Sequence, residues 1–323
     1  MTDRNHSLLT LGLLSISLLW SPTAATATKV VTILSGEGGI YRQVFNGINT
    51  TLLADNTPAD IEILQHILPS GTSEIENFDP LSGSADLVVS IGTLATEFVL
   101  ASDTETPHLS VLIPQNRFDA LLTEHGHKED GYRSVIFLDQ PVERQISLIS
   151  VLFPPDTKVG VLVDSSRRDL EGRIEESADR HSVKISVSEI LPDQNVVRHI
   201  RRLVEESDLG LAVDHSLTLQ PSIAKWLLYT AYRSRKPIIA FSKAYLNAGA
   251  LAAVYSTPEQ FGRHAGEEIR NIVDPDQTRH PFRRYSRYFS VDFNDSVARS
   301  LGVSLPDKEK LRFILNAESG FEK

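Results

Sequence analysis

Apolar residues along the chain form two kinds of pattern, short continuous runs and segments that repeat about every four residues. The run Lys158–Val163 (KVGVLV) is short and rich in valine, which is typical of a buried parallel strand. Between residues 170 and 178, apolar side chains recur at every fourth position and define one face of a helix. Lys184–Ile190 returns to the alternation of a strand. This order predicts a parallel sheet covered by helices, with ligands bound at the loops that follow the strands.

The same patterns continue through the rest of the chain and predict an α/β protein. Further strands are expected at Lys29–Leu34, Ile61–Gln65, Asp86–Ile91, Pro107–Pro114, Leu209–Val213, Pro237–Phe241, Ala248–Val254 and Tyr288–Asp292. Further helices are expected around Val44–Leu52, after Gly92, and at Gln140–Phe153, Val196–Glu206, Ser222–Ser234, Thr257–Val273 and Asn294–Gly302.

Three of these helices begin with recognisable capping residues. Asn294 is expected to cap the short helix that ends near Gly302. Thr257 precedes Pro258 and is followed after three residues by Gln260, which is the pattern of a capping box. Thr93 is expected to cap the helix that follows Gly92. The free N–H groups at the start of that helix either bind a carboxylate or other anion, or meet water.

Three stretches are expected to lack regular structure. Asn116–Gly131 is polar and is predicted to be a solvated loop, although its His125 and His127 could hold a metal if other ligands completed the site. Ser35–Gly39 is predicted to be a tight turn that lets a ligand approach the backbone, because it matches no phosphate-binding motif. Ser242–Tyr245 is expected to end the strand before it.

Length and charge limit the class of protein. A chain of 323 residues with 41% apolar content indicates a globular protein of two lobes. We expect lobe one at 28–138, lobe two at 139–250, and a return segment at 251–323 that completes the lobes and forms the tail. The formal net charge of −10 argues against nucleic acid or an anionic membrane as the main partner. The basic cluster Arg279–Arg287 is expected to be an exposed strand edge or a solvated face.

The N-terminus and the cysteine content bear on the compartment. Cysteine is absent, which excludes disulfides, thiolate chemistry and a lipid anchor on an N-terminal cysteine. Leu8–Trp20 is an apolar segment of signal-peptide length, and Ala25–Ala27 has the small residues of a cleavage site. We therefore expect residues 1–27 to be a cleaved signal peptide and the protein to be periplasmic. The alternative is an uncleaved anchor with the same body outside the membrane.

Several segments together resemble a known family. They are Ile91–Thr96 (IGTLAT), Leu152–Pro155 (LFPP) followed by Lys158–Leu162, Lys236–Ser242 (KPIIAFS), Ala248–Ala252 (AGALA), Phe261–Gly266 (FGRHAG) and Asn294–Pro306. In this order and at these spacings they are similar to the ABC-transporter substrate-binding proteins that include the tryptophan- and tyrosine-type binding proteins of bacteria. The resemblance covers about Val30 to Pro306.

The resemblance implies a periplasmic-binding-protein fold of type I, in which two Rossmann-like lobes close on a ligand about a hinge. It implies a small organic ligand, most often an amino acid, an ABC permease in the inner membrane as partner, and no cofactor. The implied ligand contacts in lobe one are Glu37, Tyr41, Thr93 and Leu94. Those in lobe two are Ser165, Ser166, Arg167, Asp214, His215, Phe241 and Ser242. Each has a structural alternative: the hydroxyl residues could cap helices, and Phe241 could belong to the core.

Three positions depart from the family pattern and bear on the ligand more than on the fold. Asp164–Arg168 (DSSRR) stands where the family commonly has an Asn and a Ser-Glu pair, Asp214–Ser216 replaces an Asn-containing turn, and Thr93-Leu94 replaces Thr-Pro. Arg167 could pair with a carboxylate and Asp214 with an ammonium group, which would suit a zwitterion.

Two functions fit these observations, and a third does not. The first is an exported solute-binding protein for an ABC transporter. The second is a periplasmic regulator or sensor partner that uses the same fold as an interaction module. The third, an enzyme, is not expected, because the chain has no GxSxG or HExxH motif and no convincing Ser-His-Asp set by spacing.

Overall fold

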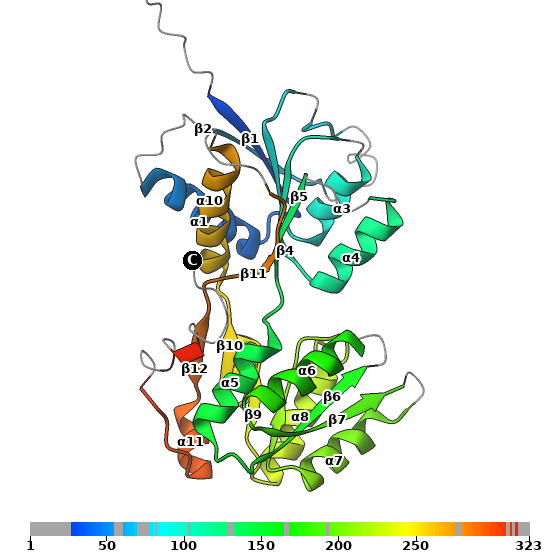
Figure 1. The fold of residues 1–323 in the computed structure, drawn as a ribbon, viewed down its shortest axis with the longest axis vertical. Coiled ribbons are helices and arrows are strands. Elements are labelled where there is room, and N and C mark those ends of the chain that lie inside the picture. The colour runs from blue at the N-terminus through cyan, green and yellow to red at the C-terminus, as the bar shows by residue number, and fades with distance from the viewer. Residues whose placement is uncertain are drawn as a thin grey trace, which may run out of the picture.

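The computed structural model describes residues 27–54, 61–69, 78–81, 83–102, 104–127, 132–164, 168–191, 194–274, 280–307, 311, 314 and 315. These residues form two lobes that are stacked along the long axis of the molecule, each built on a six-stranded sheet (Figure 1). The predicted signal peptide lies outside the described residues, apart from Ala27. Within the part of the chain that is described, no helix has the length and apolar character needed to cross a membrane.

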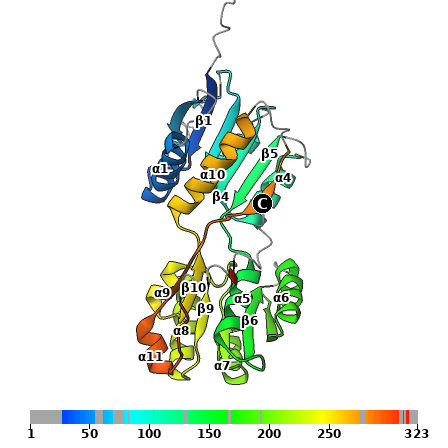
Figure 2. The ribbon, with the colours of Figure 1, turned by 60° about the vertical axis from the view of Figure 1, so that its left-hand side comes forward.

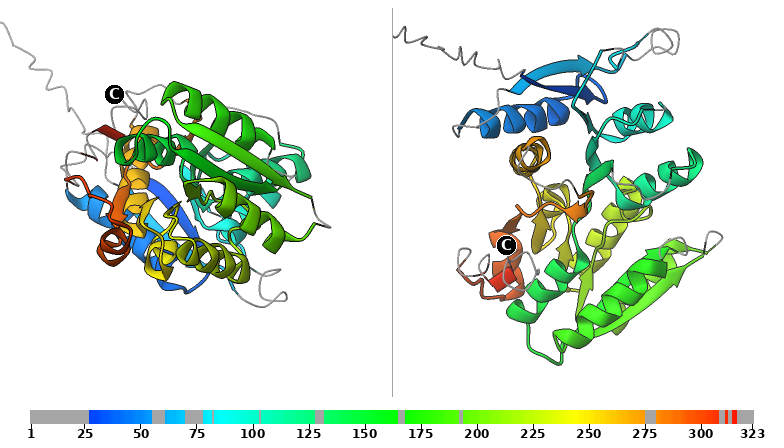
Figure 3. Two further views of the ribbon diagram at one scale, coloured as in Figure 1. Left: turned by 90° about the horizontal axis from the view of Figure 1, so that it is seen from below. Right: turned by 45° about the horizontal axis from the view of Figure 1, so that its top comes forward.

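The strands of each sheet lie side by side with helices on both faces (Figure 3). In spatial order, lobe one contains β11 (Arg283–Tyr285), β5 (Arg133–Phe137), β4 (His108–Ile113), β3 (Leu87–Ile91), β1 (Thr28–Leu34) and β2 (Ile61–Ile67). Lobe two contains β12 (Ser290–Phe293), β10 (Ala252–Tyr255), β9 (Ile238–Ala240), β8 (Leu209–Leu211), β6 (Lys158–Asp164) and β7 (Lys184–Ile190). Neighbouring strands run parallel except for β10 and β12, which are antiparallel.

The described helices are divided between the lobes. Lobe one carries α1 (Gly39–Ala54), α3 (Thr93–Ala101), α4 (Gln115–Glu124) and α10 (Pro258–Val273). Lobe two carries α5 (Val142–Leu152), α6 (Arg168–Arg180), α7 (Val196–Glu206), α8 (Pro221–Arg233), α9 (Lys243–Ala248) and α11 (Asp295–Leu301). This arrangement confirms the predicted α/β class with two lobes of mostly parallel sheet.

The C-terminal edges of the two sheets face each other. Strand β5 ends where the chain leaves lobe one for α5, and β10 ends where the chain leaves lobe two for α10 (Figure 2). Since the other strands of each sheet, except β12, run parallel to these two, their C-terminal ends also point toward the opposite lobe. Ligands of parallel α/β sheets bind at such edges, so the fold directs the loops of both lobes into one space.

The predicted helix faces account for the cores. In α1 the residues Val44, Ile48 and Leu52 are buried against the first sheet, as their four-residue spacing predicted. Leu170 and Ile174 of α6 are buried in the core of lobe two in the same way. The central strands β3 and β4 are buried along their whole length and β6 is buried after Lys158, which explains their continuous apolar runs.

Helices α1 and α10 touch through glycines (Figure 2). A Cβ atom built on Gly262 would lie 2.3 Å from the carbonyl oxygen of Val44, and one built on Gly266 would lie 2.7 Å from Cβ of Thr51. Gly47 of α1 faces Gly262, with 3.0 Å between its own built Cβ and Cα of Gly262. The segment Phe261–Gly266 therefore contains glycine where two helix backbones are in contact.

The predicted helix caps of α10 and α11 are confirmed. The Thr257 hydroxyl accepts from the backbone N–H of Gln260 at 3.2 Å, and the Gln260 side chain accepts from the backbone N–H of Thr257 at 2.8 Å. Asn294 caps α11 by accepting from Val297 N–H, and Gly302 ends that helix with a φ of 71°.

Two predictions of irregular structure were wrong. The segment expected to be a solvated loop, Asn116–Gly131, begins in α4, whose Phe118, Leu121 and Leu122 are buried although its other residues are polar. Ser242–Tyr245 does not simply end a strand, because the Ser242 hydroxyl accepts from Tyr245 N–H at 3.3 Å and starts α9.

The basic cluster contains an element that the pattern did not predict. Its residues Arg283–Tyr285 form β11, which pairs with β5 at the edge of the first sheet, and both Arg283 and Arg284 are exposed. The interpretation as an exposed strand edge is confirmed for these two arginines. A three-residue strand is too short to give a periodic signal in the sequence.

Candidate functional site

A pocket of about 420 Å³ lies between the lobes. Lobe one contributes Gln43 of α1 and Glu259 of α10, and lobe two contributes Asp214, Phe241 and Ser242. The rest of the lining consists of Leu138, Gln140, Leu219, Lys243, Tyr255, Ser256, Thr257 and Pro258. Three of the residues predicted from the sequence, Asp214, Phe241 and Ser242, thus meet in one cavity.

The topology explains why these three residues meet. Asp214 follows β8 and Phe241 follows β9, and these two strands are parallel neighbours in the second sheet. Their C-terminal loops therefore lie side by side at the edge that faces lobe one. The cavity combines two carboxylates, a lysine, hydroxyls and two aromatic rings, which is the lining expected for a small polar ligand with an apolar part.

Phe241 and Ser242 serve the fold as well as the pocket. Phe241 is only 8% exposed, and its ring lies 5.2 Å from the ring of Tyr245, measured between centroids. Ser242 is partly exposed and caps α9. Both the structural and the ligand-contact interpretations of these two residues therefore apply, and they do not exclude each other.

His215 lies behind the pocket surface instead of lining it. It is 2% exposed, its Nε2 lies 2.8 Å from the carbonyl oxygen of Leu162, and its Nδ1 lies 3.2 Å from Oδ2 of Asp164. Ser216 donates to the same carboxylate oxygen at 2.5 Å. His215 and Ser216 thus join the loop after β8 to the end of β6. Because Ser216 bonds to Asp164 and not to His215, the trio differs from a nucleophile with its base.

The predicted lobe-one residues gather near the same edge but do not line this pocket. Tyr41 packs against the turn at Gly92, where a built Cβ would lie 2.6 Å from Cε1 of Tyr41 and from Oγ of Ser35. Gly92 also has a φ of 95°, a conformation that favours glycine. Glu37 lies in the exposed turn before α1, and Leu94 is 57% exposed at the start of α3.

The prediction that Thr93 caps α3 was wrong. The N-cap residue is Gly92, Thr93 is the first helical residue, and the capping oxygen comes from Ser35, whose hydroxyl accepts from Ala95 N–H at 2.9 Å. A cap supplied 60 residues away in the chain leaves no local signal. The Ser35 hydroxyl also occupies the N–H group of Ala95, one of the groups at this helix start that could have bound an anion.

Ser165, Ser166 and Arg167 lie outside the described residues. Their predicted role in ligand binding therefore stays a prediction. The strand before them ends at the buried Asp164, and α6 begins at Arg168.

Sequence reasoning missed the part of the lining that comes from Gln43, Lys243, Tyr255 and Glu259. Glu259 lies within the capping sequence that was recognised as a helix start, but nothing in that motif indicates that α10 belongs to the lobe opposite Asp214. Gln43 is one exposed polar residue among several on α1 and carries no signal of its own.

Three segments of chain cross between the lobes, and their polar groups are bonded together. Gln140 donates to the Ser256 hydroxyl at 2.8 Å, and Ser256 donates to the carbonyl oxygen of Tyr288 at 2.7 Å. Arg144, in the first turn of α5, donates to the Gln140 side chain at 3.0 Å and to the carbonyl oxygen of Ser286 at 2.9 Å. All three crossings are therefore held by one hydrogen-bond network next to the pocket.

Arg144 is the buried centre of this network. It is 1% exposed, and its guanidinium carbon lies 4.2 Å from the centre of the Phe289 ring. Burial lowers the pKa of the Arg144 guanidinium to about 9, although the negative charge of Glu143 acts to raise it. Because about 9 is still above neutral pH, the guanidinium stays charged.

A second connection spans the lobes beside the hinge. Arg173 of α6 forms a bidentate pair with Glu143, at 3.1 and 2.8 Å, and donates to the Tyr285 hydroxyl of lobe one at 2.7 Å. Tyr285 in turn donates to the Gln115 side chain at 2.6 Å. Rotation of one lobe against the other must either move Arg173 and Tyr285 together or break the hydrogen bond between them.

The described residues contain no group of three or more His, Cys, Asp or Glu side chains placed to hold a metal ion. His127, one member of the His-x-His pair, instead has its Nε2 2.6 Å from the carbonyl oxygen of Leu100.

Comparison with known proteins gives a consistent family. The family model described as ABC transporter substrate binding protein matches residues 81–311. The chain is similar to the tyrosine-binding protein of Clostridioides difficile (strain R20291), with 22% identity over 225 residues. That alignment covers 68% of this chain and 63% of the relative, so the match spans less than two thirds of the relative's length.

Solved structures share the fold. The ligand-free, open structure of a substrate-binding protein with adhesive properties from Clostridium difficile has a TM-score of 0.64 and 18% identity, covering 88% of this chain and 97% of that one. The ABC domain from Streptococcus pneumonia in complex with L-Trp has a TM-score of 0.55 and 17% identity, covering 87% and 97%. These neighbours confirm the type I periplasmic-binding-protein architecture expected from the sequence.

Proposed function

The chain belongs to the family of ABC transporter substrate binding proteins, and we propose that it captures an amino-acid-like zwitterion, with an aromatic side chain, in the pocket between its lobes. Members of this family bind substrates and do not transform them. The observation that carries the proposal is the meeting of Asp214, Phe241 and Ser242 with Gln43 and Glu259 in one interlobe cavity.

The chemistry of the lining suits both ends of such a ligand. Asp214 offers a carboxylate for the ammonium group, and Lys243 offers an ammonium for the carboxylate. Phe241, Tyr255 and Leu219 offer an apolar and aromatic wall for the side chain. The volume of about 420 Å³ lies within the range of small-molecule sites.

Two relatives support the aromatic side chain. One is named a tyrosine-binding protein, and one structure was solved with L-Trp bound. We further propose export to the periplasm and delivery of the ligand to an ABC permease. The N-terminal apolar segment and the family support these two steps.

The test is calorimetric titration of the purified protein with L-tyrosine, L-tryptophan, L-phenylalanine, L-leucine and ribose. We expect one of the aromatic amino acids to bind with a stoichiometry of one. In Asp214→Asn the dissociation constant should rise roughly 10- to 100-fold, because a charge-assisted hydrogen bond contributes about 1.5–3 kcal/mol.

The matched control is Asp179→Asn, which removes one negative charge from an exposed position of α6 in the same lobe. Its affinity should equal that of the unchanged protein. If Asp214→Asn binds as tightly as the control, the assignment of the ammonium group to Asp214 is wrong. If a folded sample binds none of these compounds, the second hypothesis, a periplasmic regulator or sensor partner, is favoured.

A further inference from the structure

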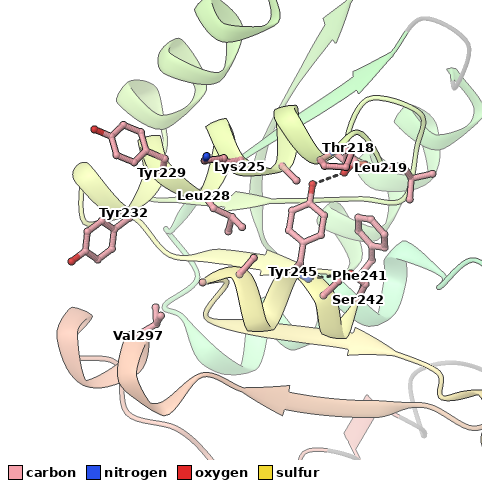
Figure 4. Close-up of a pocket in the computed structure, with 15 residues that line it drawn as sticks. Thr218, Leu219, Lys225, Leu228, Tyr229, Tyr232, Phe241, Ser242, Tyr245 and Val297 are labelled. Atoms are coloured by element: carbon pink, nitrogen blue, oxygen red, sulfur yellow. Dashed lines mark hydrogen bonds between the residues drawn. The ribbon is translucent and has the colours of Figure 1, made fainter.

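A larger cavity of about 840 Å³ lies within lobe two, between α8, α9 and the start of α11 (Figure 4). We propose that this groove is a second ligand site, which binds a single-chain anionic amphiphile, that is, an apolar chain that ends in a carboxylate. The proposal concerns a site outside the interlobe pocket and does not depend on the amino-acid ligand proposed above.

The interior of the groove offers apolar surface, because its polar groups are already paired. The Tyr245 hydroxyl donates to the carbonyl oxygen of Thr218 at 2.7 Å (Figure 4). The Thr218 hydroxyl in turn donates to backbone carbonyls, and the Ser242 hydroxyl accepts from Tyr245 N–H. The side chains between them, such as Leu228, present hydrocarbon to the cavity (Figure 4). A ligand chain inside the groove therefore needs no hydrogen bonds, and a polar one would lose those it makes with water.

The charge around the groove selects an anion. Residues 221–250 contain the five basic residues Lys225, Arg233, Arg235, Lys236 and Lys243 and no Asp or Glu, in a chain whose formal net charge is −10. Of these five, Lys225 lines the groove, and no salt bridge among the described residues involves it, whereas Lys236 lies 3.6 Å from Asp208. A carboxylate at the mouth would meet Lys225 without competition from a neighbouring acid.

The rim carries exposed aromatic side chains. Tyr229 and Tyr232 of α8 line the groove and are 52% and 74% exposed. Trp226, which is 45% exposed and does not line the groove, has its ring 6.2 Å from the Tyr229 ring, measured between centroids. In Figure 4 both Tyr229 and Tyr232 point outward from α8 at one end of the groove. Exposed aromatic clusters beside an apolar cavity mark binding surfaces, because leaving them in water is unfavourable.

The shape favours a single chain over a membrane surface. The volume of about 840 Å³ is within the range of sites that enclose small molecules. A bilayer surface is flat and could not fill a cavity bounded by two helices. The groove also shares Leu219, Phe241 and Ser242 with the interlobe pocket, so occupation of one site is expected to change the affinity of the other.

The experiment uses dodecanoate below its critical micelle concentration as the probe, titrated into the full protein by calorimetry. We expect saturable binding with a stoichiometry of one, and at least tenfold weaker binding of butyrate and of dodecyltrimethylammonium. Lys225→Gln should weaken dodecanoate at least tenfold by removing the partner of the carboxylate. Ala248→Phe, which fills the groove from an exposed position of α9, should weaken it at least tenfold by removing space.

The control Lys184→Gln removes an exposed lysine of the same lobe outside the groove and should bind dodecanoate like the unchanged protein. The proposal is overturned if dodecanoate does not bind, or if both groove variants bind it as tightly as the control. It is also overturned if the protein sediments with vesicles of phosphatidylglycerol but does not bind monomeric dodecanoate, since the surface would then recognise a membrane.

Discussion

Replacing Gly262 with alanine should lower the free energy of unfolding, although alanine is the better helix former. In an unconstrained helix this substitution would stabilise by about 1 kcal/mol. At Gly262, however, the new methyl group would lie 2.3 Å from the carbonyl oxygen of Val44 and 2.7 Å from Cα of Gly47. Both atoms belong to the backbone of α1, so no side chain can rotate away, and the two helices must separate.

The magnitude follows from these two opposing effects. Moving the helices apart by about 1 Å loses contacts along the interface, and overpacking of this kind costs about 3 kcal/mol at the upper end of its usual range. Subtracting the propensity gain leaves a net loss of about 2 kcal/mol. For a chain of 323 residues, whose unfolding entropy at the midpoint is about 0.7 kcal/mol/K, the melting temperature should fall by about 3 °C.

The assay is urea unfolding followed by circular dichroism, with Gly172→Ala as the matched control. Gly172 is an exposed position of α6 where a built Cβ meets no atom within 4 Å. The same chemical change should therefore stabilise the protein there by up to about 1 kcal/mol. Opposite signs at the two positions would show that backbone contact, and not helix propensity, decides the outcome at Gly262.

A Gly262→Ala variant at least as stable as the unchanged protein would refute the close approach of α1 and α10. The variant also bears on function, because α1 carries Gln43 and α10 carries Glu259, which line the interlobe pocket. A displaced α10 should weaken ligand binding even where the protein remains folded.

Three further predictions concern the contacts of α10 and the hinge. Burial acts to raise the pKa of Glu268, but its hydrogen bond with His264 and the charges of His264 and Arg284 outweigh burial and hold the pKa at about 2, below the usual 4.5. The contribution of Glu268 to the free energy of unfolding is present above its usual pKa and is lost as pH falls from about 5 to 2. Glu268→Gln should lower the free energy of unfolding by about 3 kcal/mol at pH 7. The variant should also flatten the pH dependence measured in urea unfolding curves. Thr257→Ala should cost about 1 kcal/mol by removing the capping oxygen of α10, measured in the same way, and Thr257→Ser should restore most of it. Arg144→Leu should destabilise by about 3 kcal/mol because it removes the donor to the Ser286 carbonyl oxygen and to the Gln140 side-chain oxygen, and a thermal unfolding curve unchanged from the starting protein would contradict the network.

The sequence predicted the elements that have a repeated pattern. The apolar stripe of α1 and the valine-rich run of β6 each reveal both the element and its buried face, because burial and periodicity have the same origin. The capping residues of α10 and α11 were predictable for a similar reason, since their partners lie only three residues away. Elements with weak periodicity, such as α4, and very short ones, such as β11, were missed.

The site was harder to predict than the fold because its contacts are remote in sequence. Asp214, Phe241 and Ser242 were found because residues that follow parallel strands meet at one edge. His215 follows a strand in the same way, but its ring turns inward to Asp164 and Leu162, and no local pattern distinguishes the two orientations. Glu259 faces the pocket only because the chain returns to lobe one after β10, and Gln43 lies near it because α1 packs against α10; both are facts of topology and not of local sequence.

We expect the two lobes to close on a ligand held between their strand ends. Because the chain has no cysteine, spin labels can be placed at Asn46→Cys of α1 and Asn247→Cys of α9, exposed positions one turn from Gln43 and Lys243 on either side of the pocket. The distance between the labels, measured by pulsed electron paramagnetic resonance during titration with the amino acid that binds in calorimetry, should shorten with the same dissociation constant. A ligand that binds while the distance stays constant would contradict the claim that the lobes close on it.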